Sequence, residues 1–303
     1  MITHPFFDGL LAHSDDELVT LIGGGITERT TIHEWPLSWV QRLILEDGTR
    51  LLYKSQLPPT VEPEFYARAS SPLLPACRML GTLRGCTTIV IEWIDAPLLG
   101  DVDSSETELV EHGRRLVEQI GQIEGDLPVY LDIGSPDRWQ VVAEGTLRDL
   151  DRLVAAGRFS RVDTEAVNAL RAWAESSVVL ATVSDEPRVV HGDLDGEQVF
   201  VTPIGYRVVD WQRPVVAPAD VDLVALLTGQ GIDARPYVDR ATIGIFWFLR
   251  LHGQWRHNAG SFRTSGDQYS ISGLPRPQTT SLDGYEGSPT IIRNCLASHM
   301  KNS

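Results

Sequence analysis

The sequence predicts an α+β protein with two lobes, a small β-rich lobe over residues 1–95 and a larger, mainly helical lobe over residues 96–260. Alternating and β-branched apolar runs gather in the first third of the chain, whereas helical periodicity dominates the part that follows. Pro97 ends the last β-branched run, because a proline cannot continue a sheet ladder. Residues 261–303 are rich in Ser, Gly, Thr and Pro and are predicted to form a loosely ordered tail.

The first predicted element is a β-hairpin within residues 38–56, where apolar side chains alternate on both sides of Asp47-Gly48. An Asp-Gly pair supports the positive φ angles of a tight turn. The second strand is expected to end at Lys54. This lysine should therefore lie near an exposed tip, and its replacement should spare the fold.

A short helix and a buried strand complete the small lobe. Pro63 suits a first helical turn, and Glu62 and Glu64 favour a helix N-terminus. The β-branched run of residues 87–94 predicts a buried strand that stops before Pro97.

The larger lobe is predicted to open with a helix after Ser105, since Glu108 follows three residues later as in a capping box. Further helices are predicted over residues 146–157, 164–177, 220–227 and 242–255. Between the second and third of these, the chain from 189 to 212 is predicted to form a short β-pair joined at Pro203 to Gly205.

Composition narrows the class of protein. The net charge of −15 argues against a nucleic-acid partner, because a phosphate backbone requires clustered Lys and Arg. The three cysteines show no metal-ligand spacing. The chain shows neither a basic flank before an apolar leader nor about 18 consecutive apolar residues. We therefore expect a cytoplasmic monomer or dimer with no membrane partner.

Two polar segments are the candidates for chemistry. The stretch VVHGDLDGEQVFV places His191, Asp193 and Gln198 on one connection between apolar runs. The stretch RVVDWQ ends an apolar run in Asp210, and a buried carboxylate is costly unless it is paired. Because Asp193 and Asp210 leave neighbouring strands, we predict that their carboxylates converge on one cation.

These segments resemble the catalytic loop and the metal-binding segment of the aminoglycoside phosphotransferase and choline kinase-like superfamily. The patterns of that family are His-Gly-Asp followed by Asn, and Asp-Trp or Asp-Phe. DVDLVALL at residues 220–227 and EPEFY at residues 62–66 resemble two helix openings of the family. The resemblance covers residues from about 18 to 256. It implies a protein-kinase-like fold that uses ATP and Mg²⁺.

The resemblance assigns roles to the four polar residues. Asp193 would accept the proton of the acceptor hydroxyl, and His191 would brace the loop. Asp210 would bind the Mg²⁺ that bridges the ATP phosphates. Gln198 stands where the family has Asn and would be a second metal ligand on a longer side chain. This departure leaves open a slow or inactive enzyme.

The resemblance also places the nucleotide. Lys54 fits the lysine that contacts ATP phosphates, and Glu62 fits the glutamate that orients it, with Glu64 as the alternative partner.

Two backbone segments complete the predicted nucleotide site. Gly24 and Gly25, in the triplet after Ile22, are predicted to cover the phosphates in a loop between two strands. Backbone groups of Glu92, Trp93 and Ile94 are predicted to hydrogen-bond adenine where the strand meets the hinge.

The sequence thus predicts an ATP- and Mg²⁺-dependent phosphotransferase that moves the γ-phosphate to a hydroxyl of a small molecule. That acceptor is an antibiotic such as an aminoglycoside, or a choline- or sugar-like metabolite. A nucleotide-binding pseudoenzyme of the same fold and a non-kinase binding protein are the alternatives. A protein kinase is disfavoured, because Asp220 and Asp222 follow Asp210 without an activation loop or an Ala-Pro-Glu signature.

Overall fold

The computed structural model describes residues 1–157 and 163–262, so the predicted tail lies outside the described residues from residue 263 on. The chain divides into two compact units. The first contains Met1–Leu131 and Val189–Val215, and the second contains Asp132–Arg188 and the described chain from Val216 on. The first unit therefore continues past residue 95 and takes in the polar loop. Within the described ranges, no helix has the length and apolar character that a bilayer span requires.

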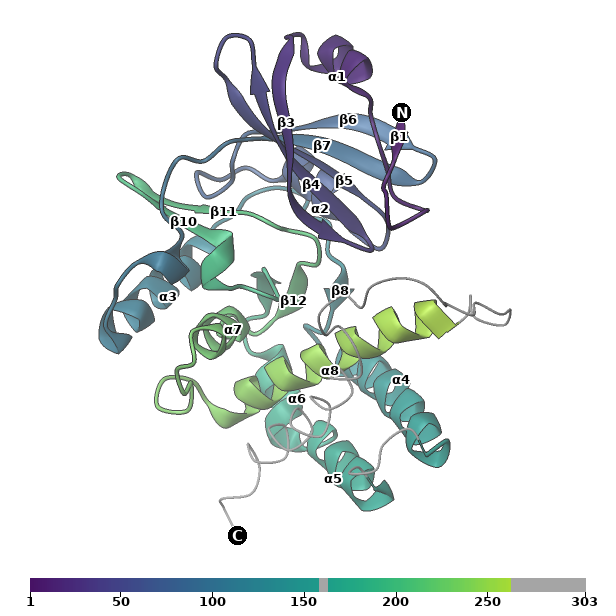
Figure 1. The fold of residues 1–303 in the computed structure, drawn as a ribbon. Helices are drawn as coiled ribbons and strands as arrows, with labels where there is room; N and C mark the ends of the chain where they lie inside the picture. Colours follow the sequence, from purple (N-terminus) through teal and green to yellow (C-terminus); the bar gives the residue numbers. More distant parts are fainter. Residues whose placement is uncertain (158–162, 263–303) are drawn as a thin grey trace. The chain divides into compact units, whose positions relative to one another are not determined.

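The centre of the first unit is an antiparallel five-stranded sheet, in the order β3-β4-β5-β7-β6 (Figure 1). Its strands are β3 (Ile26–Trp35), β4 (Ser38–Leu45), β5 (Arg50–Gln56), β6 (Cys77–Leu83) and β7 (Cys86–Glu92). The predicted hairpin is confirmed as β4 and β5, and Gly48 in its turn has a φ of 84°. Strand β3, which follows the glycine triplet, pairs with β4.

One face of this sheet is closed by the N-terminal segment. That segment contains β1 (Ile2–Thr3), β2 (Leu11–Ala12) and helix α1 (Asp15–Ile22). Leu10 and Leu18 pack there with Leu43 and Tyr53 in a hydrophobic core. Because neighbouring side chains on a strand point to opposite faces, Lys54 lies on the other face from Tyr53.

Two helices of the first unit begin as their sequences predict. Helix α2 (Glu62–Arg68) starts at the Glu-Pro pair, and α3 (Glu106–Ile120) starts after Ser105. Ser105 accepts from the Glu108 backbone N–H, and the Glu108 carboxylate accepts from the Ser105 N–H at 2.9 Å. The predicted capping box is confirmed. The short 3-10 helix η1 (Leu99–Asp101) precedes α3.

The polar loop is enclosed by short strands. Strands β10 (Val199–Thr202) and β11 (Gly205–Val208) form the predicted β-pair, and the 3-10 turn η2 (Gly196–Gln198) precedes them. The remaining strands form a three-stranded sheet in the order β8-β12-β9. They are β8 (Leu131–Asp132), β12 (Val215–Ala217) and β9 (Arg188–Val190).

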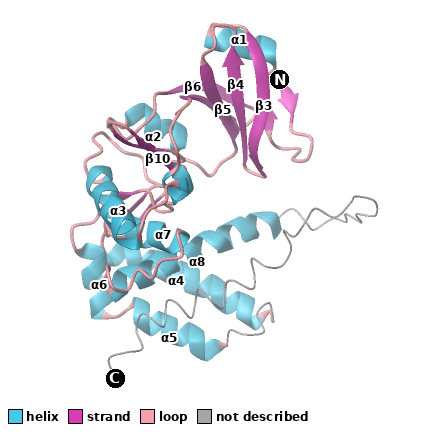
Figure 2. Cartoon of the chain, turned by 60° about the vertical axis from the view of Figure 1, so that its left-hand side comes forward, coloured by secondary structure: helices cyan, strands magenta, loops and turns pink. Residues whose placement is uncertain are grey.

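The second unit is built mainly of helices (Figure 2). They are α4 (Pro136–Ala155), α5 (Thr164–Ala174), α6 (Ser177–Ser184), α7 (Val221–Gly229) and α8 (Arg240–Phe262). Helix α4 begins ten residues before the predicted start at 146, because Ser135 caps it and Pro136 occupies its first turn. Trp139 packs on Phe248 with ring centroids 5.0 Å apart, which joins α4 to α8 in the core of this unit.

Candidate functional site

Lys54 lies at the centre of a buried ionic cluster in the first unit. Its Nζ is 2.7 Å from Glu62 Oε2 and 2.6 Å from Asp210 Oδ1. The side chains of Lys54 and Glu62 are 6% and 0% exposed, whereas that of Asp210 is 41% exposed. The expectation that Lys54 lies near an exposed tip is wrong, because β5 continues to Gln56 and places Lys54 on the interior face of the sheet.

The three charged groups of this cluster shift one another's pKa values. Burial acts to lower the pKa of Lys54, but the carboxylates of Asp210 and Glu62 outweigh it and raise that pKa. Burial also raises the pKa of Glu62, which the ammonium of Lys54 only partly offsets. For Asp210, burial is outweighed by the charge and hydrogen bond of Lys54, so its pKa is lowered. Lys54 is therefore a cation held mainly by an ionised Asp210.

Helix α2 selects which glutamate meets the lysine. Glu62 is its first residue and points inward, whereas Glu64 is exposed. The backbone N–H of Val61 donates to the Gln212 carbonyl at 3.1 Å, which ties the start of the helix to the segment that carries Asp210. The structure thus pairs Lys54 with Glu62 and leaves Glu64 at the surface.

Asp210 is held in an unusual backbone conformation. Its φ is 72°, in the left-handed region, where a residue other than glycine costs about 1–3 kcal/mol. The next residue, Trp211, is fully buried and stacks on Phe65 of α2, with ring centroids 4.4 Å apart and planes 8° from parallel. Its indole N–H donates to the Val208 carbonyl at 3.1 Å. These contacts fix the turn that aims the Asp210 carboxylate at Lys54.

The loop between β9 and η2 carries the other predicted catalytic residues. His191 is buried, its Nε2 donates to the Val209 carbonyl at 3.0 Å, and its ring lies 4.8 Å from that of Trp211. This is the geometry of a residue that braces the loop against the segment of Asp210. The side chain of Asp193 is exposed. Between them, Gly192 has a φ of 84°, and a Cβ there would lie 3.0 Å from Val215.

Gln198 is engaged within its own loop. Its side-chain oxygen accepts a hydrogen bond from the Asp195 backbone N–H at 2.9 Å. The backbone N–H of Gln198 donates to the Asp195 carbonyl at 3.1 Å. The side-chain oxygen predicted to bind a metal thus caps the η2 turn. An amide oxygen has two lone pairs, so this bond leaves one acceptor position for a cation.

The glycine triplet is not where the sequence analysis predicted it. It lies between α1 and β3, not between two strands, and Gly23 ends α1 with a φ of 88°. A Cβ on Gly25 would lie 2.4 Å from the carboxyl end of Glu46, an exposed side chain that would have to move aside. The triplet precedes the Ile26–Leu45 pair of the β3–β4 ladder. Five residues of β4, on the order of 17 Å, separate that pair from the level of Lys54.

His33 is a titratable residue of this face that the sequence analysis missed. It pairs with Val40, which pairs with Lys54, so the three side chains form one row on one face of the sheet. His33 is exposed, and after Lys54 and His191 its charge also lowers the pKa of Asp210. The β3–β4 turn at Pro36 and Leu37 lies near the level of His33 and Lys54, and the phosphate-covering role of Gly24 and Gly25 stays a prediction. Only the register of β3 could have revealed this.

The predicted hinge follows the end of β7. Glu92 is the last residue of the strand, and its backbone N–H donates to the Ala76 carbonyl at 2.9 Å. The ring of Trp93 lies 6.0 Å from the guanidinium of Arg42 and 5.7 Å from that of Arg50. Glu92 is exposed, and Trp93 and Ile94 are half-buried.

The cluster fits a divalent cation held partly by a ligand. Among residues 1–157 and 163–262, no three His, Cys, Asp or Glu side chains come together as a metal site. Mg²⁺ is usually held by one or two carboxylates together with substrate phosphates and water. Asp210 Oδ1 accepts from Lys54, and the 41% exposure of its side chain leaves the carboxylate accessible. Glu62 Oε1 is buried without a hydrogen bond of good geometry in the described chain, so the ionic cluster is incomplete by itself.

One known protein family matches most of this chain. The model of the phosphotransferase enzyme family matches residues 41–250. A search of curated proteins finds no significant match.

Solved structures resemble most of the chain at low sequence identity. A choline/ethanolamine kinase family protein from Mesorhizobium loti is 13% identical, with a TM-score of 0.61 over 95% of this chain and 94% of that one. A thermostable mutant of an aminoglycoside phosphotransferase is 13% identical, with a TM-score of 0.59 over 95% and 100%. A spectinomycin phosphotransferase in complex with ADP and spectinomycin is 14% identical, with a TM-score of 0.54 over 94% and 98%. The predicted kinase-like α+β fold class is confirmed.

Proposed function

Because the chain belongs to the phosphotransferase enzyme family, we propose that it transfers the γ-phosphate of ATP to a hydroxyl group of a small molecule. The observation that carries this proposal is the Lys54 ammonium held at 2.7 and 2.6 Å between the carboxylates of Glu62 and Asp210. A buried cation between two acids from distant segments is a costly arrangement for stability alone. It is a useful one for receiving phosphate.

Lys54 and Asp210 divide the recognition of the nucleotide between them. Lys54 donates to the phosphate oxygens while Glu62 keeps it in place. Asp210 would hold Mg²⁺, with the remaining acceptor position of Gln198 as a second protein oxygen. The ion would supply charge neutralisation of the phosphates.

Asp193 is the proposed general base. Its carboxylate is exposed on a loop that His191 ties to Val209, one residue before Asp210. An acceptor hydroxyl that donates a hydrogen bond to Asp193 loses its proton there as its oxygen bonds to the γ-phosphorus. The bond from that phosphorus to the β–γ bridging oxygen breaks, and ADP leaves. His191 is a positioning residue, because its ring nitrogen is committed to the Val209 carbonyl.

Two further segments are proposed to contact the nucleotide. Backbone groups of Glu92, Trp93 and Ile94 would meet adenine at the end of β7, as predicted. His33 would donate to the phosphates from β3.

The acceptor is proposed to be a small hydroxylated molecule. The similar structures are named for aminoglycoside, spectinomycin and choline or ethanolamine as substrates. The net charge of −15 suits a cationic acceptor, which these classes share. The proposal extends to the class and to no single compound.

A product screen tests the function. The full chain is incubated with Mg²⁺, ATP labelled in the γ-phosphate and a panel of aminoglycosides, spectinomycin, amino alcohols and sugars, with the Asp193→Asn variant as the blank. Transfer of label to at least one acceptor by the wild type and not by the variant is expected. Binding of MgATP without transfer to any compound would favour the pseudoenzyme, and no binding of MgATP would favour the non-kinase alternative.

A further inference from the structure

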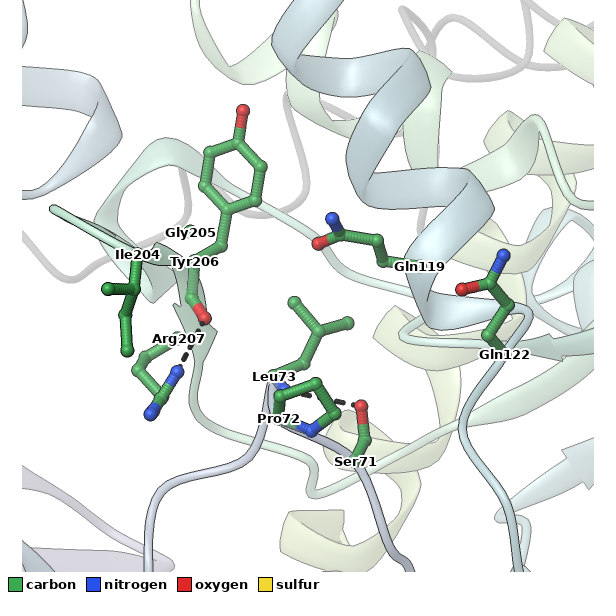
Figure 3. Close-up of a pocket in the computed structure, with 9 residues that line it drawn as sticks. All are labelled: Ser71, Pro72, Leu73, Gln119, Gln122, Ile204, Gly205, Tyr206 and Arg207. Carbon is green, nitrogen blue, oxygen red and sulfur yellow. Dashed lines mark hydrogen bonds between the residues drawn. The ribbon is translucent and has the colours of Figure 1, made fainter.

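A second pocket in the first unit lies outside the ionic cluster. Its volume is about 200 Å³, and none of its nine lining residues belongs to the Lys54 cluster or to the polar loop. Three segments enclose it: the loop after α2, the C-terminal end of α3, and the β10–β11 turn with β11 (Figure 3). It is smaller than the pockets of drug-sized ligands, so its occupant should be a small molecule.

The polar side chains of this pocket include two glutamines and one arginine. Gln119 and Gln122 each contribute a side-chain amide, which can both donate and accept hydrogen bonds. Arg207 donates to the Tyr206 carbonyl at 3.2 Å, and a guanidinium carries five N–H donors. Arg207 is half-buried and makes no ion pair with any described residue, although this chain has 41 acidic residues against 26 Lys and Arg.

The lining contains no carboxylate, so Arg207 is its sole formal charge. An arginine without an acid beside it favours a planar or tetrahedral oxyanion, which it can bind through two N–H groups. The apolar side of the pocket is formed by Leu73, Pro72 and Ile204. These groups together suit a small organic anion with an apolar or hydroxylated body.

The pocket walls are joined to both acids of the ionic cluster. The Leu73 carbonyl accepts from the Val208 N–H at 2.8 Å, two residues before Asp210. Ser70, which follows α2 and thus Glu62, exchanges backbone hydrogen bonds of 2.8 and 3.1 Å with Glu124. A ligand that tightens these walls acts on α2 and β11 together.

We propose that this pocket binds a small organic oxyanion, a carboxylate or a phosphate ester, and that its occupation changes the nucleotide affinity of the Lys54 site. The coupling rests on the proposed function, whereas the binding of the anion does not. By linkage, MgADP must change the affinity for the anion by the same factor.

The test uses the full chain and three probes: malonate as a dicarboxylate, glycerol phosphate as a phosphate ester, and glycerol as the neutral body of the latter. Calorimetry measures their binding with and without saturating MgADP, which separates this pocket from the nucleotide site. We expect at least one anion to bind in both conditions and glycerol not to bind. The anion that binds identifies the oxyanion class.

Matched variants locate the site. Arg207→Gln should weaken the binding of the anion by about tenfold or more, a loss of about 1.4 kcal/mol in binding free energy. Arg115→Gln removes an exposed arginine of α3 outside the pocket and should leave the affinity for the anion unchanged. Gln122→Leu, at an exposed position, is a second pocket variant and should weaken the anion as well. Absence of anion binding, equal binding of glycerol, or unchanged binding in both pocket variants would overturn the site.

The coupling has its own readout. MgADP affinity should change by about fivefold or more when the anion is bound. Unchanged MgADP affinity would overturn the coupling and leave the anion site. A chain that binds the anion but no MgADP would refute the proposed function and spare the anion site, so the two failures are distinguishable.

Discussion

On strand β5, Tyr53 and Lys54 point to opposite faces of the sheet, and both are buried. The Tyr53 hydroxyl accepts from the His13 N–H at 3.0 Å within a hydrophobic core, and burial raises the pKa of Tyr53 to about 12. Lys54 instead meets two carboxylates from α2 and from the segment after β11. On the face of Tyr53, the polar group is hydrogen-bonded within the fold. On the face of Lys54, three charged side chains lie together, and we propose that they bind a ligand. This difference separates residues for stability from residues for function.

Asp193 extends the comparison to an exposed charged residue of the polar loop. Asp193→Asn should lower turnover by about 10² to 10⁴, the usual contribution of a positioned general base. Its exposure predicts little change in stability, and its proposed role toward the acceptor hydroxyl predicts MgADP affinity within a few-fold. Steady-state kinetics and calorimetry check both. A variant that keeps most of its turnover would remove Asp193 from the role of base.

Lys54 tests whether the charged face also stabilises the fold. Lys54→Met leaves Glu62 and Asp210 without their cation and should cost about 3–5 kcal/mol in the free energy of unfolding. Adding Glu62→Gln removes one of the two carboxylates that the first substitution leaves without a cation. The double variant should therefore recover most of the lost free energy of unfolding. Urea unfolding of both variants is the measurement. A single variant as stable as the wild type would mean that the cluster is not buried as described.

A substitution at Gln198 distinguishes a role in stabilising the loop from a role in binding the metal. Asn at this position is too short to keep the bond to the Asp195 N–H, so Gln198→Asn should cost about 1 kcal/mol of stability. If the same oxygen also reaches Mg²⁺, the Mg²⁺ concentration for half-maximal turnover should rise. Glu197→Gln, an exposed change in the same turn, is the control. Identical Mg²⁺ curves for wild type and Gln198→Asn would remove Gln198 from the metal site.

Tyr53 gives the smallest expected effect and completes the comparison. Tyr53→Phe removes the hydroxyl that accepts from His13 and should cost about 1 kcal/mol of unfolding free energy. MgADP affinity should not change, since the ring still packs on the closed face. A loss of nucleotide affinity equal to that of a Lys54 variant would show that the two faces are not independent.

The sequence predicted the parts of this site whose signal is local. The β4–β5 hairpin follows from the alternation around Asp47-Gly48, and α3 follows from its capping box, because both depend on residues a few positions apart. His191, Asp193 and Asp210 were found through motif resemblance. Their functional roles stay predictions.

What the sequence missed depends on contacts between distant segments. Lys54 was predicted near a tip because nothing local shows that β5 continues inward. The glycine triplet was predicted to lie between two strands, although Gly23 ends α1. Strand β3, and with it His33, has weak apolar alternation because most of its side chains are exposed. Only the register of the sheet shows which residues share a level with Lys54.

Calorimetric titration of MgADP tests the central claim, that the Lys54 cluster is the phosphate site of a nucleotide. The titration compares the wild type with the Lys54→Met, Glu62→Gln double variant, after thermal melting has shown both to be folded. The account predicts that the wild type binds MgADP and that the folded double variant has lost at least about tenfold in affinity, or 1.4 kcal/mol. A folded double variant that binds MgADP as tightly as the wild type would contradict it.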